Sequence, residues 1–172
     1  MALAYFITFT TYGTWVDGTE KGLGSVDREH NQYGSEFVEP DPAREAGARE
    51  AMTQPIYSMD AARRTVVRDA IVALAREKGW RLLAVHVRSN HVHVVIWTDR
   101  EPGRLMSDLK GRASRDLTCA GFENAERRRW TRHDSTRHLF TNQEGERKVE
   151  YTLDEQGPRM AVFDGRDEPR TK

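Results

Sequence analysis

The sequence predicts an α+β domain built on an antiparallel sheet. Aromatic and β-branched residues alternate near the start of the chain, and two further β-branched segments flank a short polar turn. Two segments with apolar residues at helical spacing separate the expected strands. The order strand, helix, strand, strand, helix, strand is that of a ferredoxin-like or RRM-like sheet with helices packed on one face. One more helix is expected after this unit.

The composition fits a single soluble domain. The 172 residues include 27 basic and 27 acidic side chains, and 37% of them are apolar. Cys119 is the only cysteine, so neither an intramolecular disulfide nor a cysteine-based zinc site can form. The first residues lack the basic segment of a signal peptide, and no apolar run reaches the ~18 residues that span a bilayer. We therefore expect a cytoplasmic protein with no membrane segment.

The N-terminal part is expected to hold one strand and a long insertion. The strand covers residues 3–10 and ends at the segment 12–15 (YGTW). Residues 17–57 form the insertion, because scattered glycines and charges leave no sustained period there. Within it, Asp41 and Pro42 suit the cap and first turn of a short helix. The role of the insertion is left open.

The middle of the chain carries the clearest elements. A helix is expected from Ser58, as its N-cap, to Gly79, as its stop. Strands at 80–87 and 91–97 form a hairpin around a three-residue polar turn. The next helix has apolar residues at four-residue steps, namely Leu105, Leu109, Ala113 and Leu117.

The C-terminal part has one weak signal and one strong signal. Residues 130–140 fit one or two edge strands. Thr141 and Glu144 have the spacing of a capping box, which opens a last helix that ends near Gly157. One domain is therefore expected over residues 1–157. The charged tail, 158–172, is expected to fray.

His91 and His93 lie on the second strand of the expected hairpin. Because side chains alternate along a strand, both imidazoles point to one face, roughly 6–7 Å apart at ~3.3 Å rise per residue. Such a pair can bind one metal ion if a third group approaches from elsewhere in the fold. The alternative is a half-buried strand that carries two solvated histidines on its outer face.

The last helix offers candidates for that third group. Tyr151 and Glu155 are four residues apart and share a helix face with Arg147 and Lys148. Apolar residues on the opposite face can anchor the helix to the sheet. The alternative is a solvated charged face with an amphipathic tyrosine.

Five short motifs follow one another along the chain: residues 6–15 (FITFTTYGTW), 89–93 (SNHVH), 105–110 (LMSDLK), Trp130 and 151–157 (YTLDEQG). In this order and spacing they resemble the single-tyrosine HUH transposases of small insertion sequences, especially the REP-associated tyrosine transposases. The resemblance covers most of the chain. It implies a metal-dependent endonuclease and strand transferase that cleaves single-stranded DNA next to hairpins through a 5′-phosphotyrosyl intermediate.

The resemblance also implies the site residues. His91 and His93 would bind a divalent cation, Mg²⁺ or Mn²⁺, and Tyr151 would be the nucleophile. In such enzymes a polar residue four positions after the tyrosine completes the metal site; here it is Glu155, with Gln156 as a substitute. Basic residues are expected to contact the DNA: Lys110, Arg112, Arg115, Arg127, Arg128, Arg129, Arg132, Arg147 and Lys148.

The single tyrosine limits each subunit to one covalent bond with DNA. Full strand exchange would therefore need a homodimer or sequential use of one site. A DNA substrate also implies that the cytoplasmic protein associates with the nucleoid.

Two other interpretations stay open from the sequence. His86 could act as a third imidazole beside His91 and His93, which would give a zinc-like site. A non-enzymatic interpretation is a domesticated transposase that recognises DNA hairpins without cutting them, or an RNA-binding protein of RRM-like fold. The aromatic signature expected on the strands of an RRM is absent.

Overall fold

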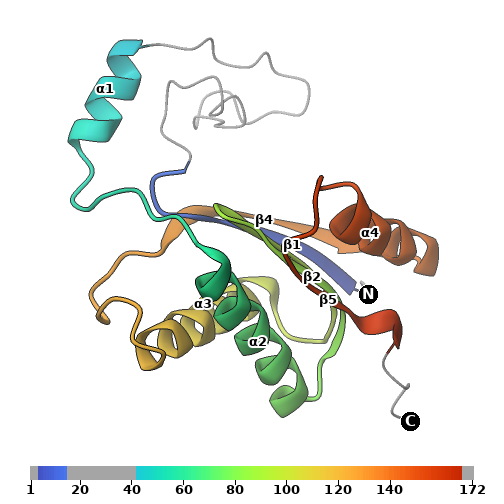
Figure 1. Ribbon diagram of the computed structural model, residues 1–172. Helices are drawn as coiled ribbons and strands as arrows, with labels where there is room; N and C mark the ends of the chain where they lie inside the picture. The colour runs from blue at the N-terminus through green and yellow to red at the C-terminus, as the bar shows by residue number, and fades with distance from the viewer. Residues whose placement is uncertain (1–3, 15–41, 168–172) are drawn as a thin grey trace.

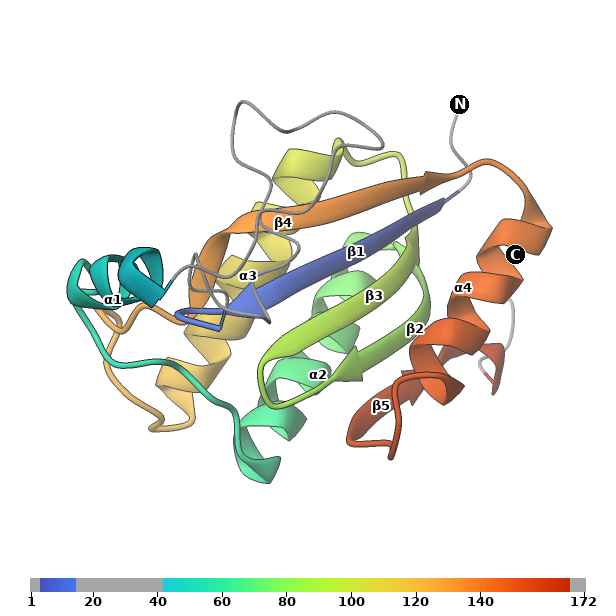
Figure 2. The same cartoon turned by 90° about the horizontal axis from the view of Figure 1, so that it is seen from above.

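A five-stranded antiparallel sheet forms the centre of the structure, a computed structural model that describes residues 4–14 and 42–167. Its strand order is β4-β1-β3-β2-β5, so β4 and β5 form the two edges (Figure 2). The strands are β1 (Ala4–Thr11), β2 (Arg81–Val87), β3 (His91–Trp97), β4 (Trp130–Leu139) and β5 (Ala161–Asp164). The helices are α1 (Pro42–Glu50), α2 (Ala61–Lys78), α3 (Pro102–Cys119), α4 (Asn142–Asp154) and the 3-10 turn η2 (Gly165–Asp167).

The helices cover the two faces of the sheet unequally. Helices α2 and α3 pack together on one face, and α4 lies alone on the other (Figure 1). This arrangement confirms the expected α+β fold, with two helices on one face and an appended C-terminal helix. In the described part of the chain, no helix is both long enough and apolar enough to cross a bilayer.

The main hydrophobic core lies between the sheet and helices α2 and α3. On β1, Ile7 and Phe9 point to this side and are fully buried. Helix α3 contributes the four apolar residues predicted from their spacing, and all four are fully buried. Burial of each large apolar side chain contributes roughly 1.5–3 kcal/mol, so this layer supplies most of the stabilising apolar contacts.

The start of α2 differs from the prediction. Its N-cap is Asp60, whose carboxylate accepts a hydrogen bond from the Arg63 backbone N–H at 2.9 Å. Ser58 does not cap the helix, because the extended chain first buries Tyr57 and Met59 on either side of it. The predicted stop is confirmed: Gly79 adopts a left-handed conformation with φ of 67°.

Helix α4 begins as predicted and packs on a smaller core. The Thr141 hydroxyl accepts from the Glu144 N–H, and the Glu144 carboxylate accepts from the Thr141 N–H, both at 3.1 Å. Val149 and Leu153, on the inner face of the helix, are buried against apolar residues of the sheet. The expected anchoring of this helix is thereby confirmed.

The charged tail does not fray over its first part, contrary to the prediction. Residues 161–164 form β5, which pairs with β2 so that Val162 lies opposite His86. Four residues within a charged segment give too short a pattern to stand out in the sequence. The sheet therefore extends past residue 157, and residues 168–172 lie outside the described chain.

The insertion after β1 is described only in its second half. Helix α1 starts at Pro42 as predicted, and its expected cap, Asp41, lies with residues 15–40 outside the described chain. After α1, the chain runs back to the domain along the end of β1, where the Thr53 N–H donates to the Tyr12 hydroxyl at 3.2 Å.

Candidate functional site

The two histidines lie side by side on the α4 face of the sheet. In the antiparallel register of β1 and β3, His93 lies opposite Thr8 and His91 opposite Thr10. The ring centroids of His91 and His93 are 4.8 Å apart. His93 is 7% exposed, whereas His91 is half-buried. The predicted pairing of the imidazoles on one face is therefore present in the structure.

Hydrogen bonds orient both imidazole rings. Nδ1 of His91 is 2.7 Å from the Asn90 side-chain oxygen, which only accepts, so Nδ1 carries the proton and Nε2 keeps its lone pair. Nδ1 of His93 is 2.8 Å from the Thr8 hydroxyl, which can donate or accept. The Gln156 side-chain oxygen, 3.2 Å from Nε2 of His93, only accepts, so without a metal Nε2 carries the proton and Nδ1 accepts from Thr8. In the other tautomer Nδ1 would donate to Thr8, and the Nε2 lone pair would be available to a metal.

Burial keeps both histidines neutral. Desolvation, with a smaller contribution from the nearby charge of Arg88, lowers the pKa of His91 to about 4. Desolvation also lowers the pKa of His93 to about 3, with a smaller effect from His91. Since the neutral imidazole is the form that binds a metal, the pair is in its ligand form at neutral pH.

Gln156, rather than Glu155, faces the histidines. Its side-chain oxygen is 3.2 Å from Nε2 of His93, and its amide nitrogen donates to the Tyr151 carbonyl at 3.3 Å. Glu155 is exposed and caps α4, with φ of −101° and ψ of 6°. Because the helix ends at Asp154, the next turn directs Gln156 toward the sheet. The four-residue helical spacing used in the prediction does not hold beyond that point.

The donor set suits a hard divalent cation. Within residues 4–14 and 42–167, no three His, Cys, Asp or Glu side chains gather closely enough to hold a metal ion. Two imidazole nitrogens and the Gln156 amide oxygen are nevertheless a mixed set that Mg²⁺ or Mn²⁺ can accept. The side chains around His93 therefore fit the cation that the sequence implies, with Gln156 in the place expected for Glu155.

Tyr151 lies beside this group of side chains. Its ring centroid is 5.9 Å from that of His93 and 5.8 Å from that of Phe6. The Phe6 ring stacks on His93 at 5.4 Å. The Lys148 ammonium is 4.5 Å from the centre of the Tyr151 ring and 4.6 Å from that of Phe6. A phenol, two imidazoles, an amide and a cation thus share one face of the sheet.

His86 has a structural role, so the zinc-like alternative is wrong for this structure. Its ring is fully buried, with Nδ1 donating to the Thr152 carbonyl at 2.9 Å. The Met160 N–H donates to Nε2 of the same ring at 3.1 Å. Both nitrogens are therefore occupied and none is left for a metal. The ring ties α4 and the segment before β5 to strand β2.

Several cations expected to bind DNA instead hold the fold together. Lys110 donates to the Asp134 carboxylate at 2.5 Å, and Arg112 forms ion pairs with Glu77 and Asp116. Arg127 and Arg129 donate to groups of the loops around them, and the Arg129 side chain is almost fully buried. The others are exposed or half-buried: Arg115, Arg128, Arg132, Arg147 and Lys148.

Sequence reasoning missed four residues near the histidines. Phe6 and Thr8 reach His93 through the register of β1 against β3, which no local pattern reveals. Arg137 lies opposite Phe6 on the other neighbour of β1. The role of Asn90 had a local signal, because it directly precedes the histidine pair within the quoted motif.

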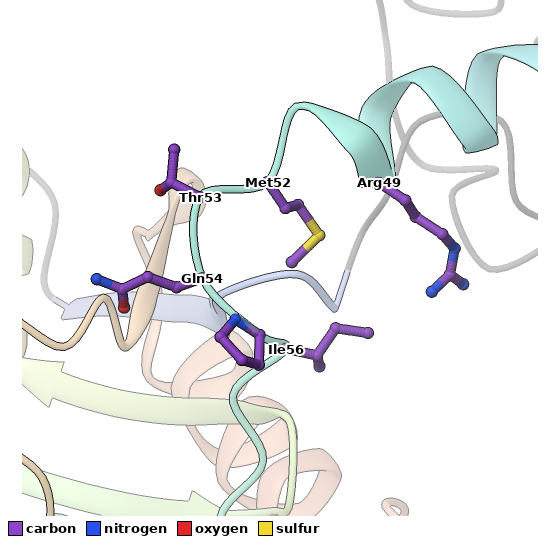
Figure 3. A pocket seen from close by; sticks show the side chains of 6 residues that line it. Arg49, Met52, Thr53, Gln54 and Ile56 are labelled. Atoms are coloured by element: carbon purple, nitrogen blue, oxygen red, sulfur yellow. The ribbon is translucent and has the colours of Figure 1, made fainter.

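Two of the surface hollows in the described part of the chain differ in the side chains that line them. The larger, about 440 Å³, lies along the segment after α1 (Figure 3) and is lined by Arg49, Met52, Thr53, Gln54, Pro55 and Ile56. It contains no histidine or acidic side chain. The smaller, about 240 Å³, is lined in part by Lys148, Tyr151 and Glu155. We therefore place the candidate site on the α4 face.

Comparison with known proteins identifies the family of the chain. Residues 56–153, more than half of the chain, match the family described as IS200-like transposases. This match includes His91, His93 and Tyr151 and ends before Gln156. None of the curated protein sequences matches the chain significantly.

One solved structure shares the fold of this chain. A REP-associated tyrosine transposase bound to a REP hairpin superposes with a TM-score of 0.50 at 11% identity, over 89% of this chain and 66% of that chain. This chain thus spans just under two thirds of that protein's length. A proposed transposase from Deinococcus radiodurans R1 gives a TM-score of 0.44 at 14% identity, over 94% of each chain. From the family match, we conclude that the chain belongs to the IS200-like transposases.

Proposed function

We propose that this chain is a metal-dependent endonuclease and strand transferase for single-stranded DNA, with Tyr151 as its nucleophile. One observation carries the proposal: the Tyr151 ring lies 5.9 Å from His93, whose Nε2 faces the Gln156 oxygen at 3.2 Å. A nucleophile and a set of metal ligands on one sheet face are the parts that phosphodiester transfer requires.

In this proposal, Nε2 of His91, Nε2 of His93 and the Gln156 side-chain oxygen hold Mg²⁺ or Mn²⁺. The bound cation would supply charge neutralisation and polarisation at the scissile phosphate. Asn90 keeps the proton on Nδ1 of His91, and Thr8 can accept a proton from Nδ1 of His93, which would leave both Nε2 lone pairs available to the cation. Glu155, four residues after the tyrosine, is the competing third ligand.

The reaction is a transesterification that conserves one phosphodiester bond. The phenolic oxygen of Tyr151 attacks the phosphorus, and the bond from phosphorus to the 3′ oxygen breaks. The phenol proton passes to solvent, and the departing 3′ oxygen takes up a proton to become a hydroxyl. The 5′ phosphate remains on Tyr151, so a 3′ hydroxyl can later attack it and reseal the strand without ATP. Lys148, whose ammonium group lies 4.5 Å from the centre of the phenol ring, would add positive charge near the scissile phosphate.

The proposed substrate is single-stranded DNA next to a hairpin. The REP-associated transposase that shares this fold is bound to such a hairpin, which supports the proposal for this chain. Each chain carries one Tyr151, so exchange between two DNA ends would use two copies, as in a homodimer, or two successive reactions. The proposed place of action is the nucleoid.

The test is a search for the covalent intermediate. A labelled hairpin with a single-stranded 5′ extension is incubated with protein and Mn²⁺ and then separated on a denaturing gel. We expect a protein–DNA adduct that disappears in Tyr151→Phe and persists in the matched control Tyr5→Phe, on the other sheet face. An adduct that survives Tyr151→Phe refutes the nucleophile. Tight hairpin binding with no adduct from the unmodified chain favours the non-catalytic binding protein.

A second experiment compares two variants, Gln156→Ala and Glu155→Ala, to identify the third metal ligand. Replacing an oxygen ligand weakens cation binding, so Gln156→Ala should raise the Mn²⁺ concentration for half-maximal cleavage by about 10-fold or more. Glu155→Ala should leave it within about twofold. The opposite ranking would assign Glu155 as the ligand and Gln156 as a residue that only supports the end of the helix.

A further inference from the structure

The smaller hollow next to Tyr151 brings together three cations. Its volume is about 240 Å³ and its lining includes Arg137, Arg147 and Lys148, with Tyr151 at one side. Arg137 comes from edge strand β4, and the other two come from α4. The register places Arg137 directly opposite Phe6, whose ring contacts both Lys148 and Tyr151. The cations therefore converge from two elements on the space beside the nucleophile.

Within residues 4–14 and 42–167, these three cations form no ion pair, unlike Lys110 and Arg112. In the described part of the chain, no ion pair or hydrogen bond engages the side chain of Arg137, Arg147 or Lys148. Glu144 and Glu155 also line the hollow. The Glu144 carboxylate already accepts the backbone N–H groups of Phe140 and Thr141. By contrast, Lys110 is held by the Asp134 carboxylate on the opposite side of β4.

The charges that act most strongly on Lys148 are positive. Burial, together with repulsion from Arg137 and Arg147, lowers the pKa of its ammonium group. Glu155 opposes this effect, but its contribution is the smallest of the four. An anion in the hollow would relieve the repulsion, and arginine side chains suit a phosphate because their N–H groups can donate in pairs.

We propose that this hollow binds a second backbone phosphate of the DNA strand, adjacent to the scissile one. The inference rests on the proposed function, which puts the scissile phosphate at Tyr151 and His93. Since Tyr151 lines the hollow together with the cations, a strand that reaches the nucleophile would lay its neighbouring phosphate over Arg137 and Arg147. This contact would fix the direction in which the strand crosses α4. The ligand of the hollow would be a backbone phosphodiester, which it would bind independently of the base sequence.

The first test measures binding without chemistry. Tyr151→Phe protein in EDTA is titrated with a fluorescent hairpin bearing a single-stranded extension, at several salt concentrations. Adding Arg137→Gln and Arg147→Gln should weaken binding about 10-fold and reduce the slope of log affinity against log salt by about 0.7, as expected for one lost single-strand phosphate contact. The matched control Arg104→Gln changes an exposed arginine of α3, on the other face of the sheet, and should leave the slope unchanged.

The second test locates the phosphate. Replacing the one phosphate next to the cleavage point by an uncharged methylphosphonate should weaken binding by a similar factor in the parent protein. The same replacement should have no further effect in the double-arginine variant, because the contact is already lost. If the double variant does not fold by circular dichroism, Arg147→Gln alone serves, since this side chain is exposed.

The outcomes separate this proposal from the proposed function. Equal salt slopes in the double variant and in Arg104→Gln overturn the phosphate site, even when the unmodified chain forms its covalent adduct. A reduced slope, matched by the methylphosphonate at one position, supports the phosphate site even when no adduct forms. In that second case only the cleavage activity is refuted.

Discussion

The two faces of the sheet use the same strands for different purposes. On the α2/α3 face, Ile7 and Phe9 of β1 are fully buried in the larger hydrophobic core. On the α4 face, Thr8 of the same strand begins a polar row with His93 and His86 on the next two strands, according to the register. Because successive side chains of a strand point to opposite faces, the core residues lie on one face and the candidate site residues lie on the other. Changes on the two faces should therefore affect different measurements.

The largest expected effect is on the α4 face. His93→Gln removes an imidazole ligand, and cleavage of the hairpin substrate should fall by at least about 100-fold, since even residues that only orient ligands cost about 10–100-fold. Urea denaturation should show that most of the free energy of unfolding remains. A loss of folding equal to the loss of cleavage would contradict the separation of the two faces.

The reverse pattern is expected on the α2/α3 face. Leu109 is fully buried, and Leu109→Ala should lower the free energy of unfolding by about 2–5 kcal/mol, because it leaves a cavity in the core. Cleavage per folded molecule, measured at low temperature where the variant stays folded, should match that of the unmodified chain. A specific loss of cleavage there would show that the α3 face contributes to the site.

A change at His86 should affect both stability and cleavage, because this buried residue lies on the α4 face and holds α4 in place. Removing its ring in His86→Ala leaves the Thr152 carbonyl and the Met160 N–H without partners, at a cost of about 1–3 kcal/mol for each buried group. We expect both lower stability and slower cleavage, because α4 carries Tyr151. His86→Gln, whose amide can donate and accept, should restore part of each. Rescue of stability without any rescue of cleavage would rule out a positioning role.

The last expected effect is a gradual one, a pH dependence of stability. The pKa values of His91 and His93 are lowered to about 4 and about 3 in the folded chain, so the unfolded chain binds more protons between pH 6.5 and these values. The free energy of unfolding should therefore decrease as the pH falls through this range, by at most about 1.4 kcal/mol per pH unit for each histidine. Urea denaturation in EDTA should show a flatter profile for His93→Gln than for the unmodified chain.

Much of this architecture follows from local patterns. The alternation in β1 and β3, the four-residue steps of α3 and the capping box at Thr141 are each set by nearby residues, and the structure contains all three. His91 and His93 were placed on one face for the same reason. The spacing of apolar residues is enough to predict these elements, because each of them buries an apolar side against the rest of the protein.

The remaining features depend on contacts between distant segments. The end of α4 at Asp154 decides that Gln156 faces His93, and a rule based on four-residue spacing selects Glu155 instead. The pairing of Lys110 with Asp134 depends on how α3 meets β4, so a sequence count of basic residues overestimates the cations available to DNA. Strand β5 is recognisable only from the exposed edge of β2 that it covers.

Strand β5 also determines how the tyrosine helix is held. The chain enters α4 from β4, at one edge of the sheet, and leaves it for β5, at the other edge (Figure 2). To exchange α4 with a neighbouring molecule, the chain would have to detach a whole edge strand as well as the helix. The rate of adduct formation per molecule should therefore stay constant on dilution, and mixing an inactive His93 variant with an inactive Tyr151 variant should not restore it.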